Sequence, residues 1–258
     1  MPVSTTVTGM VLSAMPVGDY DKRLVILTKE IGKISAFAKG ARRPNSALLA
    51  CSQPFSFGEF SLYAGKSSYN IVSAQISNYF GELRDDYEGL MYGFYFCEFA
   101  DYLTKENNDE INILKLLYQT LRVLTKKSID PKLIRAIFEF KIMSLNGETP
   151  QVFECIKCER NTKEAKEETQ ELPVGRYYFS AESGGILCEQ CVRVDRNAIS
   201  IRTSTLYTMQ YIISMEIEKL YTFKVTDEVL EELKRCIKHY LNRYIDHEFK
   251  SLEMLQVL

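Results

Sequence analysis

Two pairs of cysteines form the strongest chemical pattern in this sequence of 258 residues. Cys155 and Cys158 make one Cys-x2-Cys pair, and Cys188 and Cys191 make a second pair after 29 intervening residues. A gap of two residues lets both thiolates of a pair reach one tetrahedral ion at about 2.3 Å, as in structural zinc sites. Four thiolates leave no open coordination position for water. The spacing therefore predicts one structural Zn²⁺ on Cys155, Cys158, Cys188 and Cys191.

Other uses of these cysteines are weaker alternatives. A redox pair requires a Cys-x2-Cys at a strand-to-helix junction in a βαβ unit, and the sequence pattern has no such unit. Thiols that hold no metal are the remaining alternative. Cys155 to Cys191 includes five basic and seven acidic residues, so a phosphate chain would be repelled more than attracted. We expect zinc to staple an insert at about residues 150–195 that is too small for its own core, with Lys163 to Glu171 as a solvated tip. A protein-docking surface on this insert is a further alternative.

A cluster of cations forms the second pattern. Lys39, Arg42 and Arg43 lie within five residues, in a segment that Gly40 and Pro44 mark as a loop. Loop cations on a rigid scaffold can grip a phosphate chain without reading its sequence. A lone charge cluster is more often an ordinary solvated loop, but this one follows a strand of a predicted barrel. We therefore expect nucleic acid to be bound by Lys39, Arg42 and Arg43, with a second tier of cations on neighbouring strands: Lys22, Arg23 and Lys33.

Aromatic side chains could stack on bases beside these cations. Tyr63 and Tyr69 flank a short turn and are the candidates for stacking. The phenylalanines of the same region fit a hydrophobic core better; these are Phe37, Phe55, Phe57 and Phe60.

Catalytic patterns are missing from the sequence. Gly65-Lys66-Ser67 lacks the Gly that a phosphate loop needs five residues before its second Gly, where this chain has Phe60. It also lies between two predicted strands, whereas a phosphate loop leads into a helix. The two histidines, His239 and His247, lie in the region of the last predicted helix with no nucleophile beside them in sequence. We expect a binding protein and not an enzyme.

Composition and charge agree with a folded binding protein. Apolar residues make up 46% of the chain and charged residues 26%, which excludes disordered and low-complexity classes. Residues 1–80 contain eight basic and four acidic residues, a formal charge of +4, and the remainder carries −6. A polyanion responds to the local field of the module that it meets. The amino-terminal third is therefore the predicted nucleic-acid face.

Cellular location can be predicted from what the sequence lacks. No apolar run approaches the roughly 18 residues of a membrane span, and the first residues do not have the basic and then apolar pattern of a secretory signal. We expect no membrane partner and a cytoplasmic location. The seven cysteines would there be reduced thiols or metal ligands.

The elements that position these residues change in type near Gly81. Before it, runs rich in β-branched and aromatic residues predict five strands. Gly32 can adopt the positive φ of a hairpin turn between the second and third strands, and a change of apolar parity across Gly58 predicts a β-bulge. Such a pattern fits a small barrel of the oligonucleotide-binding (OB) type, and an SH3-like barrel fits nearly as well. The strands fall at about residues 7–11, 24–27, 34–38, 55–63 and 69–76.

After Gly81 the apolar period becomes helical. The first predicted helix is apolar almost all round, which indicates a buried helix, and Thr226 can cap the last one. The prediction is an α+β protein, with an OB-type barrel over residues 1–80 and a helical domain over residues 81–258 that carries the zinc insert. The helices are predicted over residues 87–103, 111–124, 131–145, 205–220 and 226–245.

The order of these features resembles the RecO family of bacterial recombination mediators. The resemblance covers essentially the whole chain. Glu159 and Val192 depart from the family pattern, in which a Gly commonly follows each cysteine pair. The segments that carry the likeness are Lys39-Gly40-x-Arg42-Arg43-x-x-Ser46, Leu145-Asn146-Gly147-x-x-Pro150 and, most specific of all, Phe179-Ser180-x3-Gly184-Gly185-x-Leu187-Cys188-x2-Cys191.

This resemblance implies an amino-terminal OB-type barrel followed by a helical domain with a zinc insert. It also implies binding of single- and double-stranded DNA and annealing of complementary strands. The implied partners are RecR, which acts jointly in placing RecA, and the single-stranded-DNA-binding protein that coats the DNA. The implied location is the bacterial cytoplasm, at the nucleoid. The alternative is a zinc-stapled interaction module that docks other proteins without direct DNA binding.

Overall fold

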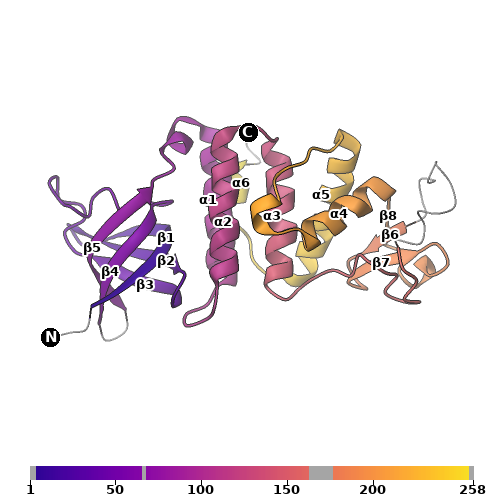
Figure 1. Ribbon diagram of the computed structural model, residues 1–258, viewed down its shortest axis with the longest axis horizontal. Helices are drawn as coiled ribbons and strands as arrows, with labels where there is room; N and C mark the ends of the chain where they lie inside the picture. The colour runs from indigo at the N-terminus through magenta and orange to yellow at the C-terminus, as the bar shows by residue number, and fades with distance from the viewer. Residues whose placement is uncertain (1–3, 66–67, 163–176, 256–258) are drawn as a thin grey trace. The chain divides into compact units, whose positions relative to one another are not determined.

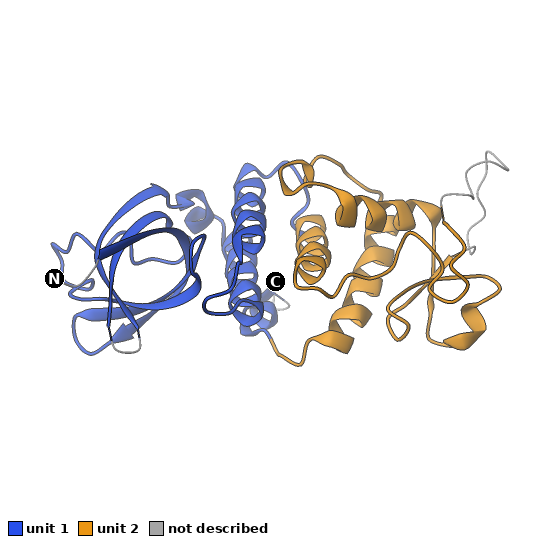
Figure 2. Cartoon of the chain, turned by 60° about the horizontal axis from the view of Figure 1, so that its bottom comes forward, with its two compact units in different colours: residues 1–131, 249–258 blue, residues 132–248 orange. Residues whose placement is uncertain are grey.

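The computed structural model describes residues 4–65, 68–162 and 177–255. Lys66, Ser67, Arg176 and the solvated tip predicted at Lys163 to Glu171 lie outside the described residues. The chain forms two compact units, of residues 1–131 with 249–258 and of residues 132–248, which Figure 2 draws in blue and orange. The predicted domain boundary at residue 80 stays a prediction. Among the helices described, none combines the length and the apolar character that a membrane crossing requires.

The first unit begins with a closed barrel of five strands (Figure 1). Hydrogen bonds join the strands in the order β1-β2-β3-β5-β4, and β1 pairs with β4 to close the sheet. The β3–β5 pairing is parallel and the other pairings are antiparallel. A five-stranded barrel within an α+β chain confirms the predicted fold class. The strands are β1 (Ser4–Val17), β2 (Asp21–Thr28), β3 (Gly32–Ala38), β4 (Phe57–Ala64) and β5 (Tyr69–Asn78).

Two glycines allow the barrel to turn and close. Every second residue of β3 is buried, as expected for a strand with one face in a core. Gly32 begins this strand with a φ of 68°, so the predicted hairpin turn is confirmed. A Cβ at Gly58 would lie 2.2 Å from the carbonyl oxygen of Gln75, and the β4–β5 register shifts between Phe57 and Gly58. The predicted irregularity at Gly58 is thus confirmed.

The fourth strand begins two residues later than predicted. Phe55 is buried, but its φ of 71° is left-handed and incompatible with a strand. Its ring lies 5.1 Å from the ring of Phe94, and its N–H donates to the carbonyl oxygen of Val11 at 2.9 Å. Packing against Phe94 therefore fixes this residue. The prediction that Phe55 belongs to the core is right, and its assignment to a strand is wrong.

Two long helices continue the first unit after the short 3₁₀ helix η1 (Gly81–Asp85): α1 (Tyr87–Leu103) and α2 (Ile111–Lys126). Residues on nearly every side of α1 are buried, as its sequence predicts. Asp86 caps α1, because its carboxylate accepts from the N–H of Gly89 at 3.2 Å. The ammonium of Lys127, 2.9 Å from this carboxylate, lowers the pKa of Asp86 together with that N–H. One charged pair thus links the start of α1 to the end of α2.

The carboxyl-terminal helix α6 (Lys250–Leu255) packs against α1, far from it in sequence. The carboxylate of Glu98 in α1 accepts hydrogen bonds from the N–H groups of Lys250 and Ser251 at 3.1 and 3.0 Å. Glu98 therefore caps α6 from another helix. Phe249 precedes α6 and lies among three rings of α1 at centroid separations of 4.7 to 5.9 Å; these belong to Tyr95, Phe99 and Tyr102.

We expect Glu98→Ala to loosen α6 while the barrel stays folded. The change removes the acceptor for two N–H groups at the start of the helix, and a lost cap costs about 0.5–2 kcal/mol. Hydrogen–deuterium exchange should rise in residues 249–255 and stay unchanged in β1 to β5. Glu98→Gln keeps an acceptor oxygen and is the matched control, with a smaller expected rise. Equal protection of α6 in all three proteins would show that Glu98 does not hold it.

The second unit combines three helices with a small sheet of order β7-β6-β8. Lys141 lies in α3 and is 6% exposed. Its ammonium donates to the carbonyl oxygens of Ile213 and Met215 at 2.7 and 2.8 Å, at the end of α4, and burial lowers its pKa. The ammonium of Lys141 in α3 thus caps the carboxyl end of α4. The elements are α3 (Pro131–Leu145), β6 (Tyr177–Ser180), β7 (Gly185–Cys188), β8 (Ile199–Ile201), α4 (Thr203–Ser214) and α5 (Asp227–Tyr244), with the 3₁₀ helices η3 (Val192–Val194) and η4 (Ile217–Lys219).

Candidate functional site

The two cysteine pairs occupy two short turns of the second unit. In the first turn, the N–H of Glu159 donates to the carbonyl oxygen of Cys155 at 2.8 Å. In the second, which begins at the end of β7, the N–H of Cys191 donates to the carbonyl oxygen of Cys188 at 2.9 Å. Each turn folds back on its first cysteine, which lets both thiols of a pair face one point.

Strand pairing in the insert brings the two turns together. β6 and β7 form an antiparallel hairpin. The N–H of Ile156 in the first turn donates to the carbonyl oxygen of Ile186 in β7 at 2.8 Å. Gln210 of α4 donates to the carbonyl oxygen of Val152 and to the hydroxyl of Thr162, at 2.8 Å each. The bond of Ile156 holds the first turn beside β7, and the two bonds of Gln210 tie the residues that flank this turn to α4.

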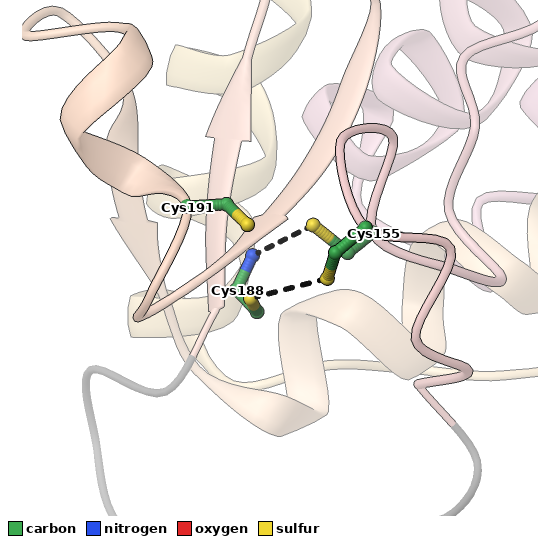
Figure 3. Close-up of side chains that lie close together, drawn as sticks. Cys155, Cys188 and Cys191 are labelled. Carbon is green, nitrogen blue, oxygen red and sulfur yellow. Dashed lines mark hydrogen bonds between the residues drawn. The ribbon is translucent and has the colours of Figure 1, made fainter.

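The four thiols converge on one point. Their sulfur atoms all lie within 4.8 Å of one another, and the Sγ atoms of Cys158 and Cys188 are 3.8 Å apart. A tetrahedral ion with metal–sulfur bonds of about 2.3 Å has sulfur–sulfur edges of about 3.8 Å. Figure 3 shows the side chains of Cys155, Cys188 and Cys191 directed toward one another. The cysteine cluster, which we define as Cys155, Cys158, Cys188 and Cys191, could therefore hold a metal ion.

Electrostatics within the cysteine cluster favour a cation. Burial by itself raises the pKa of Cys155, but the backbone N–H groups of Cys188, Lys157 and Cys158 outweigh burial and lower that pKa to about 6. The N–H of Cys188 donates to this sulfur at 3.4 Å. Desolvation and the three neighbouring thiols raise the pKa of Cys191 to about 12. Four thiolates at this spacing repel one another, and a divalent cation would remove that repulsion.

The two departures from the family pattern have different structural consequences. Glu159 has a φ of 59°, in the left-handed region that Gly adopts without steric cost. A side chain there costs roughly 1–2 kcal/mol. Val192 instead begins η3, where a side chain fits an ordinary helical backbone. Only the first turn therefore carries backbone strain, and the convergence of the four sulfur atoms is retained in spite of it.

Three of the predicted cations lie together on the barrel. Lys39, Arg42 and Arg43 are exposed and form what we call the cationic loop, directly after β3. The backbone N–H of Arg42 donates to the carbonyl oxygen of Tyr20 at 2.9 Å, and its Nη1 donates to that of Gly18, also at 2.9 Å. These bonds fix the cationic loop against the turn between β1 and β2.

The second tier of predicted cations is divided between two ends of the barrel. Lys22 and Arg23 pair with the end of β3 that leads into the cationic loop. Lys22 donates to the carbonyl oxygen of Ser52 at 3.0 Å, and burial together with nearby Arg42 lowers its pKa. Arg23 is exposed and donates through Nε to the hydroxyl of Ser35 at 2.8 Å.

Lys33 lies apart from the other predicted cations. It sits at the opposite end of β3 from Lys39, and its ammonium is 2.9 Å from a carboxylate oxygen of Asp101 in α1. An ammonium held by a carboxylate has less charge to offer a phosphate. The structure thus gathers Lys22, Arg23 and the cationic loop at one end, and their role in DNA binding stays a prediction.

The aromatic candidates for stacking are less accessible than predicted. Tyr63 and Tyr69 are both half-buried, in β4 and β5. Tyr20 is not among the predicted candidates, although its side chain is 53% exposed and the guanidinium carbon of Arg43 lies 5.0 Å from its ring centroid. Sequence alone gives little sign of this contact, because the two residues are brought together by the hairpin and loop that meet at the end of the barrel.

The fold and the site together define a class of protein: a five-stranded barrel with a cationic loop, followed by helices that carry a four-cysteine cluster. Two family models cover nearly all of this chain, the one described as Recombination protein O N terminal matching residues 1–80 and the one described as Recombination protein O C terminal matching residues 84–253. The chain belongs to the RecO family of DNA repair proteins.

Individual relatives resemble the chain over nearly its whole length. A DNA repair protein RecO from Alkaliphilus metalliredigens is 34% identical over 247 residues, which cover 95% of this chain and 96% of the relative. Proteins of the same name from Acetivibrio thermocellus and Symbiobacterium thermophilum are each 30% identical, over 97% and 98% of this chain and over 95% and 96% of their own lengths.

Proposed function

We propose that this protein is a mediator of DNA repair and homologous recombination that binds single- and double-stranded DNA. It anneals complementary strands and helps to load RecA together with RecR. The observation that carries the proposal is the position of Lys39, Arg42 and Arg43, which are exposed together on one loop of the barrel. Phosphate contacts from such a loop are independent of sequence, which suits a protein that must act on any damaged site.

Charge neutralisation is the physical basis proposed for annealing. Two complementary strands are polyanions that repel each other before their bases can pair. A cationic surface that holds both backbones lowers this repulsion and leaves the base edges free. No nucleotide hydrolysis is required for this step, so the proposal includes no enzymatic turnover. His239 and His247 are both exposed residues of the second unit, which gives no support to a catalytic role for either.

The proposed cofactor is a structural Zn²⁺ on the cysteine cluster. Four sulfur donors with a tetrahedral edge length suit zinc, and they leave no coordination position for substrate. When bound, zinc would supply a closed crosslink between the two turns. The chain's own contribution is to orient the sulfur atoms, through the hydrogen bonds of Ile156 and Gln210 described above.

The proposed partners besides DNA are RecR and the single-stranded-DNA-binding protein, and the proposed location is the bacterial cytoplasm at the nucleoid. These assignments rest on membership of the RecO family. The residues after position 80 carry a net negative charge of −6, which DNA avoids and which leaves their surface available to protein partners.

Annealing of complementary strands should be faster with this protein than without it, with and without ATP. Labelled strands coated with the single-stranded-DNA-binding protein are mixed, and duplex formation is followed over time. Uncoated strands serve as the control that separates annealing itself from removal of the coat. Annealing that is no faster, or faster only with ATP, would overturn the mediator proposal and favour the interaction module without direct DNA binding.

A further inference from the structure

Tyr20 occupies an unusual position at the end of the barrel. It is the last residue of the turn that joins β1 to β2, and its side chain is 53% exposed. Two other apolar side chains of the same hairpin are also exposed, Met15 at 63% and Val17 at 40%. Burial of a tyrosine ring removes a large apolar surface from water, and about half of this surface stays exposed at Tyr20. The exposed part of the ring is available to a ligand.

The backbone around Tyr20 is nevertheless held firmly. Its carbonyl oxygen accepts from the N–H of Arg42 at 2.9 Å, and the carbonyl oxygen of Gly18 accepts from Nη1 of Arg42 at 2.9 Å. On the other side, the carboxylate of Asp21 accepts from the N–H of Gly40 at 2.7 Å. The turn and the cationic loop thus form one rigid surface, so a ligand would meet an ordered ring.

The contact between Tyr20 and Arg43 orients the ring further. The guanidinium carbon lies 5.0 Å from the ring centroid, within the range of a cation–π interaction. This contact places a cation, which attracts phosphate, over one face of an aromatic ring, so that a base would stack on the opposite face. Lys39 and Arg42 extend the positive charge on the same loop. A strand of nucleic acid presents this same pairing of a charged backbone with a flat apolar base.

We infer that Tyr20 is a stacking platform for an unpaired base of single-stranded DNA, with Arg43 and the rest of the cationic loop on the adjacent phosphates. Bases of a duplex are already stacked on their neighbours, whereas the faces of a single strand's bases are available. Tyr20 therefore gives the barrel a preference for single strands that the cations alone do not provide. This inference rests on the proposed DNA binding and names its preferred substrate.

A tryptophan at position 20 gives a direct test, because the chain has no tryptophan of its own. Tyr20→Trp retains a stacking ring and becomes the sole tryptophan signal. Its fluorescence should be quenched by single-stranded oligonucleotides, and much less by a duplex or by an oligonucleotide of abasic sites. Tyr79→Trp is the matched control, since Tyr79 is 40% exposed in the first unit beyond the end of β5; its fluorescence should change little. Equal quenching of the Tyr20→Trp variant by abasic and normal strands overturns the inference.

Removal of the ring gives the second test. Tyr20→Ala should weaken single-strand binding by about 5- to 150-fold, the usual effect of losing one base–aromatic stack, and change duplex binding by less than about 2-fold. Tyr20→Phe keeps the ring and should bind both as the wild type does. An equal loss on single strands and duplex would mean that Tyr20 only positions Arg43, and no loss on either would place the stack elsewhere; both overturn the inference. Failure of the wild type to bind any DNA would instead overturn the proposed function, before any variant is compared.

Discussion

Replacing Cys188 by serine should abolish metal binding and loosen the insert while leaving the barrel folded. Its sulfur lies 3.8 Å from that of Cys158, and its removal leaves three thiolates, one short of a closed tetrahedral site. Binding of a structural zinc is worth about 10–16 kcal/mol in small zinc modules, so the local effect should be large. Metal content measured by mass spectrometry should fall from one zinc per chain to none. Hydrogen exchange should rise in residues 150–162 and 177–195 and remain as in the wild type in β1 to β5.

The matched control for this experiment lies in the same unit. Cys236 is a buried cysteine of α5 that does not belong to the cysteine cluster, and Cys236→Ala should retain the full metal content. Wild-type protein purified under reducing conditions, without chelator and without stoichiometric metal, would contradict the zinc proposal. Loss of metal in both variants would indicate a general loss of stability and not a ligand role for Cys188.

The sequence predicts the fold best where a local signal sets an element's ends. The helices predicted over residues 87–103 and 131–145 coincide with α1 and α3; Asp86 caps the first, and Pro131 begins the second. The helix predicted over residues 205–220 ends instead at Ser214. Lys141 binds the carbonyl oxygens of Ile213 and Met215 there. A cation more than 70 residues away in sequence is not visible in a local pattern.

Two short elements, β8 and α6, cannot be predicted from the periodicity of apolar residues. β8 has three residues and exists through its pairing with β6, and three residues are too few for an alternating pattern to be recognised. The return of α6 to the first unit depends on Glu98 and Phe249.

Thr226 occupies the predicted N-cap of α5, but its side chain makes no capping hydrogen bond with the helix backbone. The residue type therefore predicts the position of the cap and not the contact.

In the candidate site, the cysteine cluster follows from a local signal, whereas the contacts of the cations do not. The spacing of the four cysteines is enough to predict a cluster, because a Cys-x2-Cys turn constrains its own geometry. The phosphate contacts of the cations cannot be predicted in this way, because what a cation binds depends on neighbours that are distant in sequence. Lys33 is held by Asp101 of α1, and Tyr20 meets Arg43 across two segments. Neither contact follows from the residues adjacent in sequence.

Replacing both Arg42 and Arg43 by alanine should weaken DNA binding and make it less sensitive to salt. Each lost phosphate contact lowers the slope of log K against log salt concentration by about 0.7 on single strands and about 0.9 on duplex. If both residues contact phosphate, the slope for the double variant should be smaller in magnitude by about 1.4 on single strands and by about 1.8 on duplex. Binding is measured by fluorescence anisotropy over a series of salt concentrations, on oligonucleotides of unrelated sequence, which should all respond alike.

Two further variants separate local contact from overall charge. Arg193 and Arg196 are exposed in the second unit, and their double replacement by alanine removes the same two charges from the chain. If the cationic loop is the phosphate site, this control should retain the wild-type slope, because the slope counts the phosphates that are contacted and not the net charge of the chain. Arg42→Lys with Arg43→Lys keeps both charges and should also retain the slope, while losing the bidentate geometry of arginine. Slopes reduced equally by both alanine pairs would mean that net charge governs binding, and a slope reduced only by the control pair would move the DNA site onto the second unit.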